Sequence, residues 1–468
     1  MRYQLLKARA KKQKFIKRTQ QIKEDSDDSL SDDDEIELST DFIGELINDK
    51  YIVIKYLSKG TFCKVWLVYD MTVDNFYALK IQEGEDNESL LNEIKMLNII
   101  DKPSNISNLI DYFDIKINGN IKTALLFELL GDTLSYFTYD ENNSLVTIDS
   151  IKKIGKSLLL GIKELHDNNL VHCDIKLDNI LFTEVNSNIK NIINEVKEFG
   201  MNNNYNLVLQ EATKIKLDGL SKSKKKVIKK KIKKKTIKEV YNENKQNILK
   251  INNIHNKLNI SNNELNLDEA NIEEEVKDKI KSDEEEENYD EKYKLNINID
   301  NLKVKLLDLG NTEVEKFDND EEIYTRCYRP PENIINGSYD KNADIWVYGC
   351  LIYELFVGEP IFDFTNCNKY DNDRDRLHLS KMYSILGKMP KEMTQNCNYS
   401  EEYFDSKGRI LKNRNIELRD LKDELTNRID IDEEELELVL DFINKALDYN
   451  PHTRYTADEL LNHKWLNF

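Results

Sequence analysis

The sequence predicts a mixed α+β fold, and three observations lead to this prediction. Residues 51–56 and 65–69 are apolar, alternating runs on either side of a short turn, which indicates two antiparallel strands. Residues 89–97 place apolar side chains at the spacing of an amphipathic helix. A hydrophobic content of 39% over 468 residues supplies enough apolar surface for a large core.

The chemistry is concentrated in two short motifs. Residues 172–179 read His-Cys-Asp-Ile-Lys-Leu-Asp-Asn, and residues 308–311 read Asp-Leu-Gly-Asn. Phosphoryl transfer to a hydroxyl needs a carboxylate that accepts the hydroxyl proton, together with a second carboxylate and an amide oxygen that hold magnesium. The order H-x-D-x-K-x-x-N followed by D-x-G supplies these groups, and it resembles the catalytic and metal-binding loops of protein kinases. Without its partners, the octamer is equally compatible with a chance helix or turn.

The resemblance to the eukaryotic-type protein kinase family extends from residue 57 to residue 465. It implies a two-lobed α+β fold, with a small β-rich N-terminal lobe and a larger helical C-terminal lobe. It also implies that Asp174 accepts the proton and that Asn179 and Asp308 hold Mg²⁺ with ATP. Lys176 resembles the lysine with which serine/threonine kinases contact the transferred phosphate.

The phosphate-binding turn of such a kinase falls between the two predicted strands, where glycine allows close approach of the backbone. Gly60 is the one glycine that remains of the usual three, and a single glycine in a hairpin is ordinarily just a turn. The resemblance places the cofactor against Leu57, Ser58, Lys59, Gly60, Thr61, Phe62, Cys63, Lys64 and Val65.

Further along the chain, the segment 77–80 has the form of the strand whose lysine pairs with the ATP phosphates. The resemblance gives Lys80 this role, with Ala78 beside the nucleotide and Glu93 as the ion-pair partner of the lysine. A solvated lysine at a strand end is the simpler alternative. After the apolar run 124–127, the adenine-binding hinge would include Phe127, Glu128 and Leu130, although a buried strand end would read the same way.

Residues 324–332 match the end of a kinase activation segment, and residues 344–349 match the buried helix that anchors the catalytic loop. Arg454 is placed to bind Glu332 through a bidentate, charge-assisted contact. Many kinases use an arginine before the catalytic aspartate to bind an activation-loop phosphate, and Cys173 stands at that position. We therefore expect activity without activation-loop phosphorylation.

The finer resemblance is to SR-protein kinases, which phosphorylate serines in arginine/serine-rich proteins. It is carried by Cys63, Cys173, the D-L-G-N motif, T-R-x-Y-R at residues 325–329 and L-G-K-M-P at residues 386–390. The segment with Asp371, Asp373 and Asp375 resembles the docking insert of that family, and carboxylates bind guanidinium groups in bidentate pairs. The formal net charge of −19 would favour encounter with a cationic protein substrate. We expect the chain to act as a monomer.

Four segments follow from the resemblance. Residues 48–183 and 301–468 are the two parts of a split kinase domain. Residues 1–47 change from a basic to an acidic block, which predicts a disordered, charged tail. Residues 184–300 form a low-complexity charged spacer with a lysine-rich run at 222–238 and an acidic run at 268–290. The lysine run is compatible with nuclear localisation, with nucleic-acid binding, or with a tether that folds onto the acidic run.

The composition predicts an intracellular protein, cytoplasmic or nuclear. The six cysteines show no C-x-x-C spacing and indicate reduced thiols. The sequence contains no apolar run approaching the roughly 18 residues of a membrane span, so we expect no membrane association. The rival to an active kinase is a catalytically inactive scaffold, which the loss of phosphate-loop glycines suggests. The retention of all six of Lys80, Glu93, Asp174, Lys176, Asn179 and Asp308 argues against it.

Overall fold

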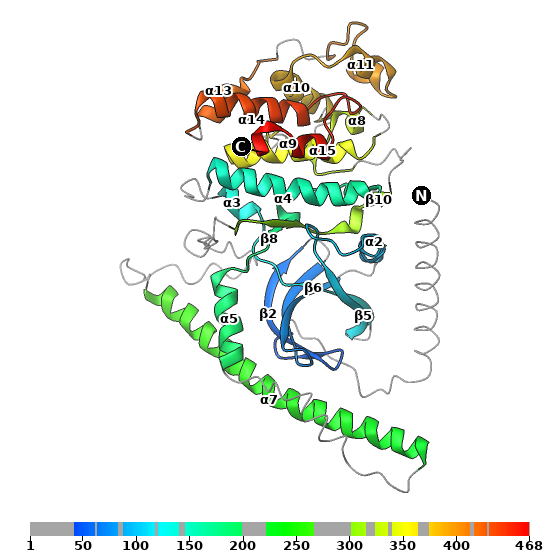
Figure 1. Ribbon diagram of the computed structural model, residues 1–468, viewed down its shortest axis with the longest axis vertical. Coiled ribbons are helices and arrows are strands. Elements are labelled where there is room, and N and C mark those ends of the chain that lie inside the picture. The colour runs from blue at the N-terminus through cyan, green and yellow to red at the C-terminus, as the bar shows by residue number, and fades with distance from the viewer. Residues whose placement is uncertain are drawn as a thin grey trace, which may run out of the picture. The chain divides into compact units, whose positions relative to one another are not determined.

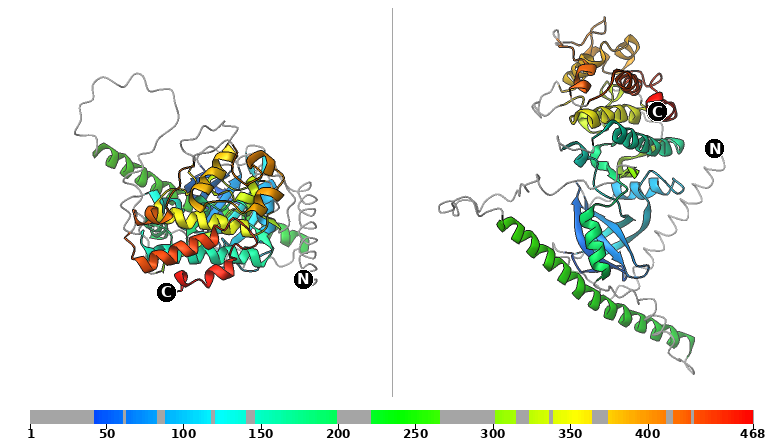
Figure 2. Two further views of the ribbon diagram at one scale, coloured as in Figure 1. Left: turned by 90° about the horizontal axis from the view of Figure 1, so that it is seen from above. Right: turned by 60° about the vertical axis from the view of Figure 1, so that its left-hand side comes forward.

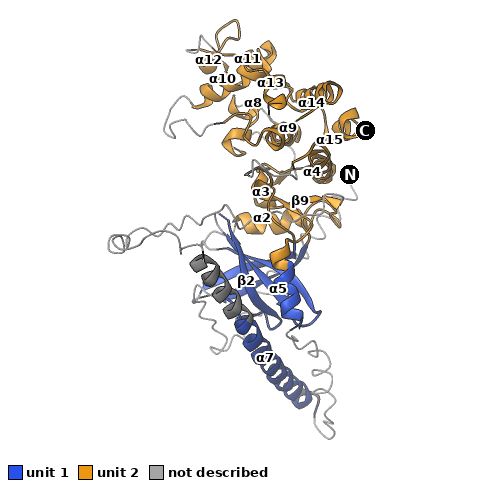
Figure 3. Cartoon of the chain, turned by 90° about the vertical axis from the view of Figure 1, so that its left-hand side faces the viewer, with its two compact units in different colours: residues 1–87, 109–129, 190–286 blue, residues 88–108, 130–189, 287–468 orange. Residues whose placement is uncertain are grey.

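The computed structural model describes residues 42–60, 63–82, 88–117, 120–139, 146–198, 221–265, 301–314, 323–335, 339–363, 374–411, 416–427 and 430–467. The chain divides into two compact units, coloured separately in Figure 3. We call residues 1–87, 109–129 and 190–286 the sheet unit, and residues 88–108, 130–189 and 287–468 the helical unit.

The sheet unit is built on one six-stranded antiparallel sheet (Figure 1). The strand order is β1-β2-β3-β4-β6-β5. The strands are β1 (Leu46–Ile47), β2 (Tyr51–Lys59), β3 (Cys63–Asp70), β4 (Asn75–Gln82), β5 (Leu109–Ile117) and β6 (Asn120–Glu128). The hairpin predicted around Gly60 is therefore present as β2 and β3, which pair antiparallel through the register Lys59 opposite Lys64.

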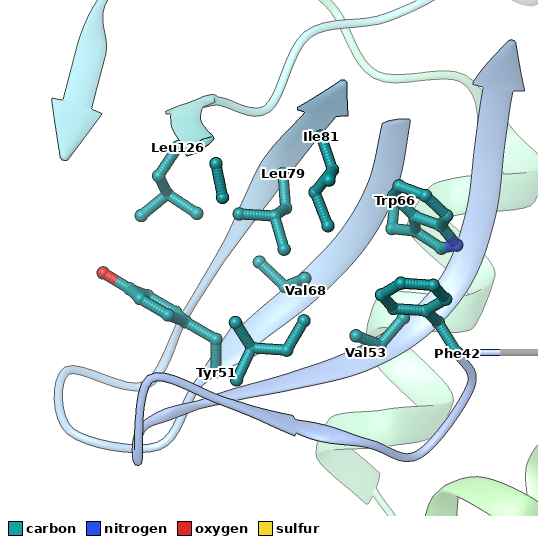
Figure 4. Packing of buried hydrophobic residues seen from close by; sticks show 10 residues of the cluster. Phe42, Tyr51, Val53, Trp66, Val68, Leu79, Ile81 and Leu126 are labelled. Atoms are coloured by element: carbon teal, nitrogen blue, oxygen red, sulfur yellow. The ribbon is translucent and has the colours of Figure 1, made fainter. Parts of the chain in front are cut away.

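One hydrophobic cluster of the sheet unit lies on one face of this sheet, while residues of the other face, such as Ile52 and Leu67, are buried as well. Figure 4 shows Phe42, Tyr51, Val53, Trp66, Val68, Leu79, Ile81 and Leu126 gathered there. The side chains come from alternate positions of β2, β3 and β4, as period-2 strands require. The ring of Phe42 packs against that of Trp66, with 4.6 Å between the centroids.

The ordered part of the sheet unit begins before residue 48, where the sequence placed the end of a disordered tail. Phe42 is buried, and β1 pairs with β2 through Leu46 opposite Ile52. An edge strand this short carries little local signal, because its stability depends on the pairing itself. Residues 1–41 lie outside the described residues.

The predicted low-complexity spacer contains two helices, α5 (Ser187–Glu198) and α7 (Lys222–Leu265). Helix α7 lies beside β2 in the sheet unit, as Figures 1 and 2 show. Its buried face consists of Thr236, Ile237, Val240, Asn244 and Ile248, which recur at helical spacing. The face is tied to the segment before β1, because the Nζ of Lys245 donates to the Oε1 of Glu45 at 2.7 Å. The acidic run at 268–290 lies outside the described residues.

The helical unit contains the catalytic motifs and most of the helices. Its helices are α2 (Glu88–Leu97), α3 (Ser135–Tyr139), α4 (Ile148–Asp167), α8 (Pro331–Ile334), α9 (Asn342–Val357), α10 (Arg374–Leu386), α11 (Lys391–Asn396), α12 (Ser400–Tyr403), α13 (Leu421–Thr426), α14 (Glu433–Ala446) and α15 (Ala457–Leu461). Short 3₁₀ turns occupy Leu177–Asn179, Leu309–Asn311, Arg326–Tyr328 and Lys464–Leu466. Two small antiparallel sheets pair β7 (Leu170–Val171) with β10 (Glu313–Val314) and β8 (Ile180–Phe182) with β9 (Val304–Leu306).

Helices α4 and α9 form the centre of the helical unit. Helix α4 begins at the N-cap Thr147, whose hydroxyl accepts from the backbone N–H of Ser150. All of α9 from Ala343 to Val357 is buried, as expected for a helix that is apolar on every side. The hydroxyl of Tyr348 donates to the carbonyl of Gly155, at 3.2 Å, and links the two helices.

These elements confirm the predicted kinase fold of a β-rich part and a helical part. The predicted amphipathic helix is α2, the predicted apolar run before the hinge is the end of β6, and the predicted buried helix is α9. Among the described residues, no helix is long and apolar enough to cross a membrane.

Candidate active site

The catalytic loop is held in the helical unit by the carboxylate of Asp344, a fully buried residue in the first turn of α9. Its Oδ2 accepts from the backbone N–H of His172 at 2.9 Å, and its Oδ1 accepts from the N–H of Cys173 at 3.4 Å. The ring Nε2 of His166, at the end of α4, donates to the same Oδ2 at 3.0 Å. Burial alone would raise the pKa of Asp344, but these donors lower it below its ordinary value.

The ring of His172 fixes the loop from the other side. Its Nε2 donates to the carbonyl of Leu307 at 2.9 Å, which leaves Nδ1 to accept from the N–H of Asp174 at 3.2 Å. This tautomer is neutral, and it joins the catalytic loop to the strand that leads into the second motif. Cys173, between them, adopts a left-handed conformation with φ of 65°.

Asp174 is surrounded by hydrogen-bond donors. The Nζ of Lys176 donates to its Oδ2 at 2.8 Å, and the side-chain amide of Asn179 donates to its backbone carbonyl at 2.9 Å. The hydroxyl of Thr325 donates to its Oδ1 at 3.3 Å. Two carboxylate oxygens can accept about four hydrogen bonds. Oδ1 therefore keeps room for the hydroxyl of a substrate, as a proton acceptor must.

Asn179 and Asp308 are brought together by the pairing of β8 with β9. Asn179 immediately precedes β8, Asp308 follows β9 by two residues, and the backbone N–H of Leu307 donates to the carbonyl of Asn179 at 2.9 Å. Asp308 has a φ of 60°, a left-handed conformation that aspartate tolerates better than most residues. The amide nitrogen of Asn179 is used by Asp174, so its Oδ1 is the atom left for a cation.

These two side chains fit the magnesium role that the sequence predicted. Magnesium is held by one or two carboxylates plus substrate phosphates rather than by an all-protein cage. The described residues contain no cluster of three or more His, Cys, Asp or Glu side chains that could hold a metal ion. Assignment of Asn179 and Asp308 as ligands stays a prediction.

Asn92, on α2, is a positioning residue that the sequence analysis missed. Its side-chain amide donates to the carbonyls of Gly310 and Thr312, at 2.9 and 2.8 Å. It therefore holds the turn that follows Asp308 against α2. The neighbouring Glu93 is buried with 2% exposure. No local pattern distinguishes Asn92 from an ordinary polar residue of an amphipathic helix.

In the sheet unit, the strand register brings Val65 of the phosphate-loop hairpin opposite Lys80 on β4, and Ala78 opposite Phe127 on β6. Directly paired residues in an antiparallel sheet point to the same face, as do residues two apart on one strand. Val65, Ala78 and Lys80 therefore share one face. The predicted pairing of Lys80 with Glu93, which belongs to the helical unit, stays a prediction.

The rest of the predicted nucleotide site is placed as follows. The turn between β2 and β3 is closed by the N–H of Gly60, which donates to the carbonyl of Cys63 at 2.8 Å. Thr61 and Phe62 lie outside the described residues. Leu57, Ser58 and Lys59 end β2, Lys64 follows Cys63 on β3, Glu128 ends β6, and Leu130 is the first residue of the helical unit after the sheet.

The predicted contact of Glu332 with Arg454 is present. The two guanidinium nitrogens Nη1 and Nη2 donate to the two carboxylate oxygens of Glu332 at 2.7 and 3.0 Å. Both side chains are buried, and this bidentate pair joins the end of the activation segment to the segment before α15.

The docking prediction needs a correction at Asp375. Its carboxylate forms an ion pair with Arg326 and accepts a hydrogen bond from the hydroxyl of Tyr403 at 3.2 Å. It is therefore a structural group of the helical unit rather than a carboxylate available to a substrate. Asp371 and Asp373 lie outside the described residues. Sequence alone could not reveal that Arg326, nearly fifty residues away, takes up this carboxylate.

The model of the protein kinase domain matches residues 51–207 and 292–466 of the chain, leaving the middle of the spacer outside the match. The chain therefore belongs to the protein kinase family. Similar proteins are named serine/threonine-protein kinases, and the chain is a serine/threonine protein kinase.

The chain is similar in sequence to several named protein kinases. The chain is 25% identical to SRSF protein kinase 3 of Mus musculus, over 93% of this chain and 91% of that protein. It is 24% identical to protein kinase dsk1 of Schizosaccharomyces pombe, over 91% of this chain and 82% of that protein. It is 23% identical to serine/threonine-protein kinase SKY1 of Saccharomyces cerevisiae, over 91% of this chain and 75% of that protein. These similarities agree with the SR-protein-kinase resemblance found in the motifs.

Proposed function

We propose that this kinase transfers the γ-phosphate of Mg-ATP to serine residues in arginine-rich proteins. The observation that carries the proposal is the set of contacts at Asp174. Lys176, Asn179 and Thr325 hold its carboxylate while leaving one oxygen with an open acceptor position.

In this proposal, Asp174 Oδ1 accepts the proton of the serine hydroxyl as the serine oxygen attacks the γ-phosphorus of ATP. The bond from that phosphorus to the β-phosphate oxygen breaks, and ADP leaves. Lys176 would stabilise negative charge beside the attacking oxygen, and Asn179 and Asp308 would hold the metal. Magnesium bound with ATP would neutralise charge on the phosphate oxygens. The pairing of β8 with β9 and the hydrogen bond from Leu307 to Asn179 join the two segments that carry Asn179 and Asp308. This connection supports the proposal, because a proton acceptor and metal ligands must keep a fixed geometry.

The preference for arginine-rich substrates is supported by charge and by the relatives. The net charge of −19 would attract a cationic peptide. One of the similar proteins is named SRSF protein kinase 3. Since Asp375 is occupied by Arg326, the carboxylates proposed for docking reduce to Asp371 and Asp373.

The test compares phosphorylation of three serine peptides of equal length: an arginine/serine repeat, an acidic peptide and a proline-directed peptide. We expect the repeat to have the highest kcat/KM, with the advantage falling as salt rises, since the Debye length is about 10 Å at 0.1 M salt. Replacing Asp371 and Asp373 by asparagine should weaken binding of long repeats more than turnover of a short one. Equal efficiency on the acidic and arginine-rich peptides would leave a serine/threonine kinase of other specificity.

A catalytically inactive scaffold is the alternative, suggested by Ser58 and Cys63 at glycine positions of the phosphate loop. Such a protein would bind no Mg-ATP or would bind it without transfer. Measuring nucleotide binding and peptide phosphorylation on the same preparation separates the two functions.

A further inference from the structure

We propose that Tyr324 is a positioning residue, which ties the activation segment to the catalytic loop where other kinases use an arginine and a phosphate. By activation segment we mean the described residues 323–332. The inference rests on the proposed function, because it concerns how the peptide-binding side of the same site is held.

Tyr324 is bound directly to the catalytic loop through its backbone, and to the carboxylate on α9 that holds that loop through its hydroxyl. Its backbone N–H donates to the carbonyl of Cys173 at 3.1 Å. Its hydroxyl donates to the Oδ1 of Asp344 at 3.0 Å. The residue after Cys173 is Asp174 itself, so both contacts end on groups that hold the catalytic aspartate. All of these residues belong to the helical unit.

The hydroxyl of Tyr324 completes the surroundings of a buried carboxylate. Asp344 is fully buried, and its oxygens also accept from His166, His172 and the N–H of Cys173. A buried carboxylate is costly unless donors surround it. Of these four donors, the tyrosine hydroxyl is the one that comes from the activation segment. The carboxylate of Asp344 therefore holds both the catalytic loop and the activation segment in place.

The backbone of Tyr324 supports this role. Its φ is 65°, a left-handed conformation that is uncommon for a bulky residue and that Cys173 shares. Such a conformation is unfavourable for this residue type and persists when the surroundings determine it strongly. Here the surroundings are the contacts to Cys173 and Asp344, together with Arg329, whose Nε donates to the carbonyl of Ile323 at 3.1 Å.

The contacts of Tyr324 also position the next residue, Thr325. The hydroxyl of Thr325 reaches the Oδ1 of Asp174, at 3.3 Å, from a backbone that Tyr324 fixes immediately before it. Cys173 carries no cationic group that would need a phosphate. A neutral hydroxyl on a buried carboxylate makes the connection instead, and this link does not depend on modification of the segment.

The first test is Tyr324→Phe, which removes one oxygen atom. Its matched control is Tyr348→Phe, since Tyr348 is a buried tyrosine of α9 whose hydroxyl also donates one hydrogen bond, to Gly155. Both variants should unfold at a lower urea concentration than the wild type, and Tyr324→Phe at the lower of the two, because its lost hydroxyl donates to a charged carboxylate. We expect Tyr324→Phe to lower kcat for peptide phosphorylation about tenfold, with the KM for ATP unchanged. Tyr348→Phe should keep the wild-type kcat.

The second test is a double-mutant cycle with Thr325→Val. If Tyr324 acts by placing Thr325, then Tyr324→Phe should lower kcat much less in the Thr325→Val background than in the wild type. A general loss of stability would instead give equal fold-losses in both backgrounds, and that result would overturn the inference. So would a wild-type kcat in Tyr324→Phe, or equal losses in the two tyrosine variants. A wild-type enzyme that transfers no phosphate would refute the proposed function itself, and the inference with it.

Discussion

The buried pair of Glu332 and Arg454 offers a direct test of how the helical unit is held together. The perturbation is Arg454→Met, which keeps much of the volume of the side chain and removes the guanidinium. That group donates to both oxygens of Glu332, to the carbonyl of Asn342 at 2.8 Å and to the carbonyl of Asp448 at 2.9 Å. It also lies 5.2 Å from the ring centroid of Trp346.

The magnitude follows from burial. The side chains of Arg454 and Glu332 are 0% and 3% exposed, so solvent screens their interaction little. Removing one partner of such a pair costs about 3–5 kcal/mol, because the other charge stays buried without compensation. A typical domain has only about 5–15 kcal/mol of stability. We therefore expect Arg454→Met to remove about a fifth or more of it. The double variant with Glu332→Met should recover much of the loss.

The assay is urea denaturation followed by tryptophan fluorescence in a Trp66→Phe background, so that Trp346 and Trp465 report on the helical unit alone. Arg409→Met is the control, because Arg409 pairs with Asp405 through a side chain that is 69% exposed. Such a surface pair should contribute about 0–1 kcal/mol. A loss at Arg454 no larger than the loss at Arg409, or a double variant less stable than Arg454→Met, would refute the reasoning.

Three further predictions concern pH, modification and salt. Burial raises the pKa of Glu354 from 4.5 to about 7, despite a hydrogen bond from Tyr328. Between these two pH values the folded state keeps a proton that the unfolded state releases. The free energy of unfolding should therefore fall by about 3 kcal/mol as pH rises from about 4.5 to 7, and stay level above pH 7. Glu354→Gln should flatten this decrease in urea titrations across pH, and an unchanged slope would contradict the assignment. Phosphatase treatment should leave the kcat of the purified enzyme unchanged. Loss of activity after this treatment would show that a phosphate is required. If the exposed lysines of α7 between residues 222 and 238 bind nucleic acid, the logarithm of the affinity should fall linearly with the logarithm of the salt concentration, as measured by fluorescence anisotropy. Replacement of Lys229, Lys230 and Lys231 by glutamine should make this slope shallower. An unchanged slope would mean that the lysines form only a solvated helix face.

The sequence predicted those parts of the site that are encoded by motifs of contiguous residues. The β2–β3 hairpin, the loop around Asp174 and helix α9 each have a local pattern, and each is where the pattern placed it. The contact between Glu332 and Arg454 spans more than a hundred residues, yet the kinase motifs between them predicted it.

Other features depend on packing that no local pattern encodes. The ion pair of Asp375 with Arg326 withdraws a carboxylate from the predicted docking surface. Asn92 becomes important only because α2 lies beside the turn after Asp308. The sequence of helix α7 has the composition of a charged, low-complexity run, because its buried face has only weak apolar periodicity. The helix packs against β2 through that face, and such tertiary packing supplies most of the stability of a helix.

The central claim is that Asp174 accepts the proton in phosphoryl transfer, and the most direct measurement compares wild type with Asp174→Asn. Transfer from Mg-ATP to an arginine/serine-repeat peptide and the Kd for Mg-ATP would be measured on the same preparations. We expect serine phosphorylation by the wild type, a kcat lower by orders of magnitude in Asp174→Asn, and a nearly unchanged Kd. Wild-type turnover in Asp174→Asn would contradict it.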